Sequence, residues 1–162
     1  MSASPVVERI LSELQELEQI IARIKEGMQK LQQTNDLLYL DSVTLNLQSF
    51  YNGIERIFES IAQDIDGHLP QGGTWHRELV SQMTQEVPEV RPAVISEHVR
   101  NELDEYRSFR HIARHIYSTK LDRARIEPLA ERVDAHFGEI SRELQAFVSF
   151  LRASESETDN RS

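Results

Sequence analysis

Arginine, histidine and tyrosine side chains are concentrated between residues 107 and 120. This stretch contains four cations, two imidazoles and a phenol, namely Arg107, Arg110, His111, Arg114, His115, Tyr117 and Lys120. Metal-free cleavage of RNA needs proton transfer to and from two oxygens and a cation that stabilises the charge on phosphorus. Histidine exchanges protons near neutral pH, and arginine offers phosphate oxygens a fixed fork of donors. Arg110 and His115 are candidates for this chemistry.

The other basic residues of the stretch suit a supporting role. Contacts from basic side chains to phosphates position a nucleic-acid strand without reading its sequence. We predict that RNA binds along Arg107, His111, Arg114 and Lys120. The nearby Tyr106 lies on an apolar stripe, which favours packing in the core over stacking on a base.

Three of these residues form a motif. Arg110, His115 and Tyr117 spell R-x4-H-x-Y, and the polar His111 directly follows the arginine. This pattern resembles the signature of HEPN ribonucleases, which is R-x4-6-H with Asn, Asp or His after the arginine. The tyrosine two places after the histidine is similar to the toxin branch of that family, called HepT.

The resemblance implies a fold and a function. It implies an all-helical, metal-independent endoribonuclease that acts as a toxin, with tRNA as the family-level expectation for its substrate. It also implies a homodimer with paired motifs at its interface. The implied antitoxin is an MNT-type nucleotidyltransferase, which transfers AMP from ATP to Tyr117 and so blocks RNA cleavage. No cofactor is implied.

Charge and composition agree with one basic site on an acidic body. The chain has a formal net charge of −9, but residues 107–125 carry six cations and one anion. The segment thus has a net charge of +5, and the rest of the chain has a net charge of −14. The chain lacks cysteine, which excludes disulfides and thiolate metal sites. No signal-peptide pattern and no membrane-length apolar run is present, so we predict a cytoplasmic protein.

Hydrophobic spacing predicts helices throughout the chain. The predicted helices cover residues 5–33, 37–66 and 75–86, a stretch that starts after Ser96, and a stretch that starts near Pro128. We predict an all-α, HEPN-like, up-and-down bundle of four long helices plus one short helix. Its single domain spans residues 1–152. The polar residues 153–162 are predicted to be a disordered tail.

Three local features carry further predictions. Gly53 lies in the middle of the second helix, where it weakens the helix. A kink is one explanation for it, but we favour close packing against a neighbouring helix. Residues 87–95 contain two prolines and are predicted to be extended, because residues before proline avoid the α region. Apolar spacing also predicts that Ile112 and Ile116 are buried together with the rest of the motif helix.

The geometry of one straight helix separates the motif residues. At 100° per residue, Arg110 and Tyr117 lie about 20° apart, but His115 lies about 140° from Arg110. Such a helix cannot direct Arg110 and His115 at one atom. Either the helix loosens before His115, or a second subunit completes a composite cleft. The family resemblance favours the second subunit.

Other kinds of site and function remain as alternatives. His111 and His115 lie four residues apart, as in zinc-binding helices, but the glutamate of H-E-x-x-H and a third ligand are missing. We therefore predict no metal site. A non-catalytic interaction protein and a nucleotide-binding HEPN domain remain open as alternative functions. RNA cleavage by the purified protein distinguishes a ribonuclease from both.

Overall fold

The computed structural model describes residues 4–161, which are almost entirely helical. The helices are α1 (Ser4–Thr34), α2 (Leu38–Ile61) with a π-helical turn η1 (Ala62–Asp66), α3 (Trp75–Met83), α4 (Glu97–Ala113), the 3-10 turn η2 (Ser118–Lys120) and α5 (Arg123–Arg161). Within the described residues, β pairing is limited to an isolated bridge between Val87 and Arg91. The predicted all-α fold is confirmed.

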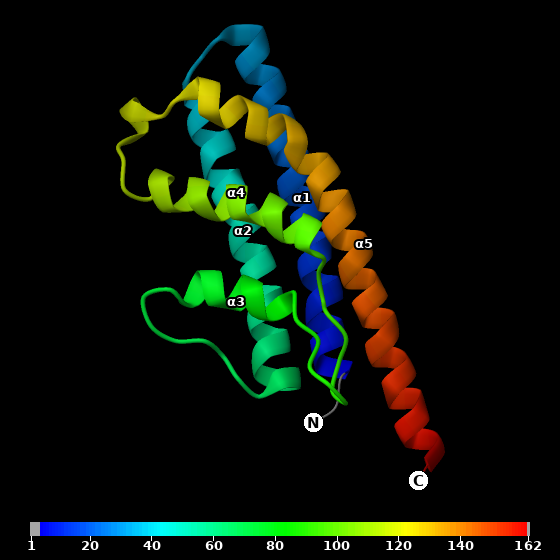
Figure 1. Ribbon diagram of the computed structural model, residues 1–162. Coiled ribbons are helices and arrows are strands. Elements are labelled where there is room, and N and C mark those ends of the chain that lie inside the picture. The colour runs from blue at the N-terminus through cyan, green and yellow to red at the C-terminus, as the bar shows by residue number, and fades with distance from the viewer. Residues whose placement is uncertain (1–3, 162) are drawn as a thin grey trace.

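The helices form a long bundle with two shorter helices set across it. Figure 1 shows α1, α2 and α5 running side by side, with α3 and α4 crossing α2 on one face. Buried side chains from all five helices meet in one hydrophobic core. At its centre, the ring of Phe50 meets Tyr106 edge-on at 5.2 Å and Phe137 at 6.2 Å. Tyr106 is therefore a core residue, as predicted.

Local hydrogen bonds explain the α1–α2 hairpin. Asn35 has a φ of 54°, and the Asp36 side chain accepts a hydrogen bond from the Leu38 amide at 3.0 Å. The two helices then pack closely at Gly53, where an added Cβ would lie 2.6 Å from Cδ2 of Leu17. The prediction that Gly53 marks close packing is confirmed.

The connector between α3 and α4 is folded, whereas the sequence predicted it to be extended. Its bridge between Val87 and Arg91 closes a turn in which Glu89 has a φ of 66°. The Arg91 guanidinium is fully buried, pairs with Asp66 at 2.6 Å and donates to the carbonyl oxygen of Gln85 at 2.7 Å. A buried charge needs such partners, so the loop turns back to supply them.

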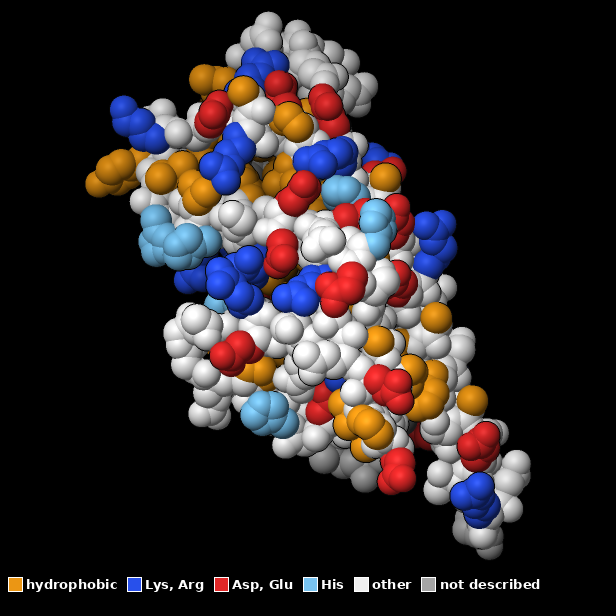
Figure 2. Space-filling view, in the orientation of Figure 1, with side chains coloured by type: hydrophobic (Ala, Val, Ile, Leu, Met, Phe, Trp, Pro, Cys, Tyr) orange, Lys and Arg blue, Asp and Glu red, His pale blue; other side chains and the backbone are white. Residues whose placement is uncertain are grey.

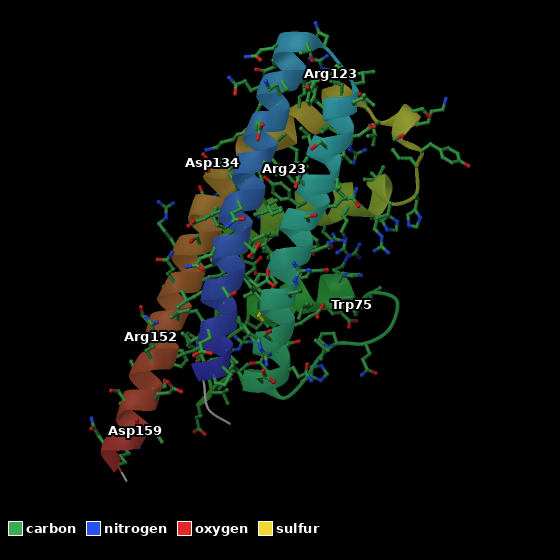
Figure 3. The ribbon with its side chains drawn as sticks, turned by 180° about the vertical axis from the view of Figure 1, so that it is seen from behind. Arg23, Trp75, Arg123, Asp134, Arg152 and Asp159 are labelled. Atoms are coloured by element: carbon green, nitrogen blue, oxygen red, sulfur yellow. The ribbon has the colours of Figure 1, made fainter. Side chains whose placement is uncertain are left out.

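Helix α5 is longer at both ends than the sequence predicted. It begins at Arg123, because Asp122 accepts a hydrogen bond from the Ala124 amide, and Pro128 therefore lies inside the helix. It continues through Arg161, where a disordered tail was predicted. Each residue added to the end of an existing helix gains a backbone hydrogen bond, and the only entropy lost is that of ordering the added residue. Figure 3 shows Asp159 beyond the ends of α1 and α2.

No helix in the described range combines the length and apolarity needed to cross a membrane.

Candidate functional site

The motif helix α4 ends just before the motif histidine. Ser96 caps its start by accepting a hydrogen bond from the Val99 amide at 3.2 Å. Its last residue is Ala113, and the His115 amide donates to Ile112, three residues back. Regular α-helix thus ends before His115, which was the first of the two alternatives.

The loosened end of α4 forms one wall of a cleft whose other wall comes from α3. The cleft is lined by Gly73, Thr74, His76, Arg77, Arg107, Arg110, His111, Arg114 and His115. Five of the seven predicted site residues therefore meet in a single chain. Lys120 and Tyr117 are not among the lining residues. Figure 2 shows Lys, Arg and His side chains gathered over this part of the molecule.

The two motif imidazoles lie on the open side of the cleft. Both His111 and His115 are exposed, and their ring centroids are 5.0 Å apart. Arg114 is also exposed, whereas Arg107 is half-buried and lies 3.3 Å from Asp104. Every ionisable side chain that lines the cleft is an arginine or a histidine. Such a surface attracts anions, above all phosphates.

Arg110 lies at the bottom of the cleft and is largely held by the protein. It is 6% exposed, and its Nη1 donates to Glu55 Oε1 at 2.7 Å and to Asn52 Oδ1 at 2.5 Å. Its guanidinium carbon lies 5.0 Å from the centre of the Tyr51 ring. Burial raises the pKa of the Tyr51 hydroxyl, which keeps that ring neutral beneath the cation. The sequence predicted a fork of donors open to phosphate oxygens, but Nη1 of this fork is already bonded within the protein.

His76 of α3 completes this buried network. Its Nδ1 lies 2.5 Å from Glu55 Oε2, and Nη2 of Arg110 lies 3.0 Å from the same Nδ1 and 3.3 Å from Nε2. The imidazole is therefore held between the carboxylate and the guanidinium. The neighbouring Trp75 ring, labelled in Figure 3, stacks 3.7 Å from the imidazole and limits its rotation.

The comparisons with known proteins identify the family. A family model described as HepT-like protein matches residues 42–151, a range that includes the whole cleft. The chain belongs to the HepT-like protein family. Neither a curated protein nor a solved structure matches it. The resemblance drawn from the R-x4-H-x-Y motif is therefore confirmed at the level of the family.

Tyr117 of this HepT-like protein stands outside the cleft. It is 81% exposed and has extended backbone directly before η2. Because α4 ends at Ala113, the predicted placement of Tyr117 on the same helical face as Arg110 is wrong. Ile116, predicted to be buried, is 40% exposed for the same reason. Ile112 is only half-buried.

Sequence reasoning missed the part of the HepT-like site that lies outside residues 107–120. Asn52, Glu55, His76 and Arg77 are distant in sequence, and nothing in the R-x4-H-x-Y motif refers to them. One signal was present in α2. Tyr51, Glu55 and Phe58 follow helical spacing beside the main apolar stripe, which indicates a second buried face.

Proposed function

We propose that this HepT-like protein is a metal-independent endoribonuclease toxin. The observation that carries the proposal is the cleft that Arg110 and His115 both line, in which every ionisable side chain is an arginine or a histidine. A phosphodiester fits such a surface because its charge needs donors and cations. The family assignment supports the same class of activity.

The proposed reaction is transfer of the phosphoryl group to the neighbouring 2′-hydroxyl. A base removes the 2′-hydroxyl proton, the 2′-oxygen bonds to phosphorus, and the 5′-oxygen leaves with a proton from an acid. The products are a 2′,3′-cyclic phosphate and a 5′-hydroxyl. His115 is the proposed acid–base group. Arg110 stabilises the charge on phosphorus through the guanidinium N–H groups that Glu55, Asn52 and His76 do not occupy.

Strand binding is proposed for the remaining predicted residues. Arg107, His111 and Arg114 lie beside Arg110 in the cleft, and Lys120 lies in η2. Together they hold the phosphates that flank the cleaved bond. The expected substrate class is structured RNA such as tRNA, as the family resemblance implies.

Incubation of the purified protein with total RNA in EDTA tests the activity. Cleavage that leaves cyclic phosphate ends is expected, and His115→Ala should reduce its rate by about 10²-fold or more. The exposed His115 contributes little to folding, so stability should change by less than about 1 kcal/mol. His68→Ala, at an exposed histidine outside the cleft, is the matched control. Cleavage that requires an added metal, or nucleotide binding without cleavage, would contradict the proposal.

We also propose that a partner nucleotidyltransferase controls the protein by adding AMP to Tyr117. The exposure of Tyr117 supports this, because its oxygen is open to attack the α-phosphorus of ATP with loss of pyrophosphate. Two residues span at most about 7 Å, so the adenylate is carried close to His115. The added phosphate competes with RNA for the basic cleft.

Mass spectrometry after incubation with the partner, ATP and Mg²⁺ tests this control. One or more AMP units are expected on the native protein, together with loss of RNA cleavage. Tyr117→Phe should keep nuclease activity and escape inactivation. Tyr39→Phe, at a half-buried tyrosine of α2, should still be modified. Modification at another residue, or neutralisation of Tyr117→Phe, would favour simple masking by complex formation.

A homodimer in which each subunit carries its own cleft is the third part of the proposal. The exposed Ile116 and Tyr117 beside the cleft support contact with a second copy. Figure 2 shows exposed hydrophobic side chains at the edge of the molecule next to the basic ones. A composite cleft is not required, because Arg110 and His115 of one chain line the same space.

Sedimentation and subunit mixing test this arrangement. The native protein should sediment as a dimer. Arg110→Ala and His115→Ala chains that are refolded together should recover no activity, because neither cleft of the mixed dimer holds both residues. Recovery of activity would instead mean that the two residues act across the interface.

A further inference from the structure

A second cluster of chemically active side chains lies between α4 and α5, away from the cleft. His98 and Glu102 lie one turn apart on α4, and Glu139 faces them from α5. The His98 Nε2 is 3.1 Å from Glu102 Oε1 and 3.1 Å from Glu139 Oε2. The three ligand atoms all lie within 4.8 Å of one another. One imidazole and two carboxylates therefore converge on a common point.

The spacing of these atoms suits a zinc-type coordination shell. Nitrogen and oxygen ligands lie about 2.0–2.2 Å from Zn²⁺, so neighbouring ligands of a tetrahedral ion are about 3.3 Å apart. Both distances from the His98 nitrogen fall close to that value. An ion would need only small side-chain adjustments. The His98 side chain is 72% exposed, which gives the ion an entry path and leaves room for water as a fourth ligand.

The charges of the cluster also favour a cation. Glu102 and Glu139 bring two carboxylates together, and the side chain of Glu102 is only 11% exposed. Within residues 4–161, the buried Glu102 Oε2 has no hydrogen-bond partner. Two carboxylates and an imidazole nitrogen that face one point favour a bound cation there.

His136 supports the cluster from behind. Its Nε2 lies 3.7 Å from Glu102 Oε1, and its Nδ1 lies 2.6 Å from the hydroxyl of the buried Tyr106. These contacts orient the imidazole toward Glu102. A polar side chain held in this way behind a ligand is typical of metal sites, where the surrounding contacts fix the ligands.

We propose that His98, Glu102 and Glu139 bind one divalent transition-metal ion of the zinc type. The ion joins the start of α4 to α5 and so stabilises the helix that carries the motif. Glu102 precedes Arg110 by eight residues, about 12 Å along the helix, so the site is separate from the cleft. It is also separate from His111 and His115, the pair for which the sequence predicted no metal site.

Titration of the metal-stripped full chain with ZnCl₂ tests the proposal. Calorimetry should give one site per chain in the native protein. His98→Gln and Glu139→Gln should each weaken binding by about tenfold or more, since each removes a ligand. His111→Gln is the matched control, because it removes an exposed histidine of α4 outside the cluster, and it should bind zinc as the native protein does.

Two further measurements separate binding at this site from other effects. Zn²⁺ should raise the melting temperature of the native protein but not that of His98→Gln, because an ion that binds only the folded state stabilises it. Co²⁺ should give visible d–d absorption in the native protein and lose it in His98→Gln, whose fold is checked by circular dichroism. Absence of zinc binding, equal binding by His98→Gln, or loss of binding in His111→Gln would overturn the proposal.

Discussion

At the scale of the residue, the buried pair of Arg110 and Glu55 connects the fold to the site. Taking both charges out of water is costly, and the pair is stable only because its hydrogen bonds are made. Asn52 and His76 supply further partners for the guanidinium. The same contacts hold Arg110 in one orientation at the base of the cleft. Glu55 is thus a positioning residue for the proposed chemistry.

Replacement of Glu55 should therefore be much more harmful than replacement of a nearby acid. Glu55→Ala leaves the Arg110 charge buried without its partner, so we expect a loss of about 3–5 kcal/mol in the free energy of unfolding. Glu59, one turn further along α2 and half-exposed, is the matched control. Glu59→Ala should cost less than about 1 kcal/mol. Urea unfolding measures both, and equal losses would contradict the structural role of Glu55.

At the scale of the element, α2 is the helix on which the site is built. It packs against α1 on one face through Gly53, and it presents Asn52 and Glu55 to α4 on another. Its position relative to α4 therefore decides where Arg110 lies. A shift of α2 away from α1 would be transmitted to the cleft, since protein interiors are packed tightly and transmit strain.

Alanine substitution at two helical glycines should have opposite effects on stability. An added Cβ at Gly53 meets Leu17 at 2.6 Å, while one at Gly138 in α5 meets nothing within 4 Å. Gly138→Ala should stabilise the protein by about 0.5–1 kcal/mol through helix propensity. Gly53→Ala should instead destabilise it by about 1–2 kcal/mol, because overpacking outweighs that gain. Thermal unfolding of the two variants shows whether each is more or less stable than the native protein. A more stable Gly53→Ala would show that the Leu17 side chain moves aside at little cost.

At the scale of the whole molecule, the distribution of charge matters more than its sum. The chain is acidic, yet residues 107–125 carry a net charge of +5. Attraction of RNA is therefore confined to the region around the cleft, and the acidic remainder repels the strand elsewhere. This arrangement favours a short contact with few phosphates, which in turn sets the dependence of binding on salt.

Removal of one cleft cation should change that dependence by a defined amount. Arg114→Ala should weaken binding of single-stranded RNA of any sequence and reduce the slope of log K against log salt by about 0.7. Arg152 is an exposed arginine on α5, which Figure 3 shows away from the loop that follows α4. Arg152→Ala should leave the slope unchanged. Fluorescence anisotropy on catalytically inactive His115→Ala protein measures both slopes, and equal changes would mean that binding is spread over the whole surface.

The sequence by itself determined the helices, the motif and the family. Helical periodicity is a local property, so α1, α2, α3 and α4 could be predicted to within a few residues of their starts. The residues that carry R-x4-H-x-Y are close in the chain, so their spacing could be recognised directly. The ends of helices were less certain. The start of α5 and the end of α4 depend on single caps and on contacts with other elements.

Only the tertiary structure decided what surrounds those residues. It brought Glu55 and His76 to Arg110, ended α4 so that His115 shares the cleft of its own chain, and set Glu139 beside His98. These partners lie tens of residues apart, and no local pattern encodes their distance. The physical reason is that a buried or clustered charge is satisfied by whichever polar group packing brings near, and packing is decided by the whole core at once.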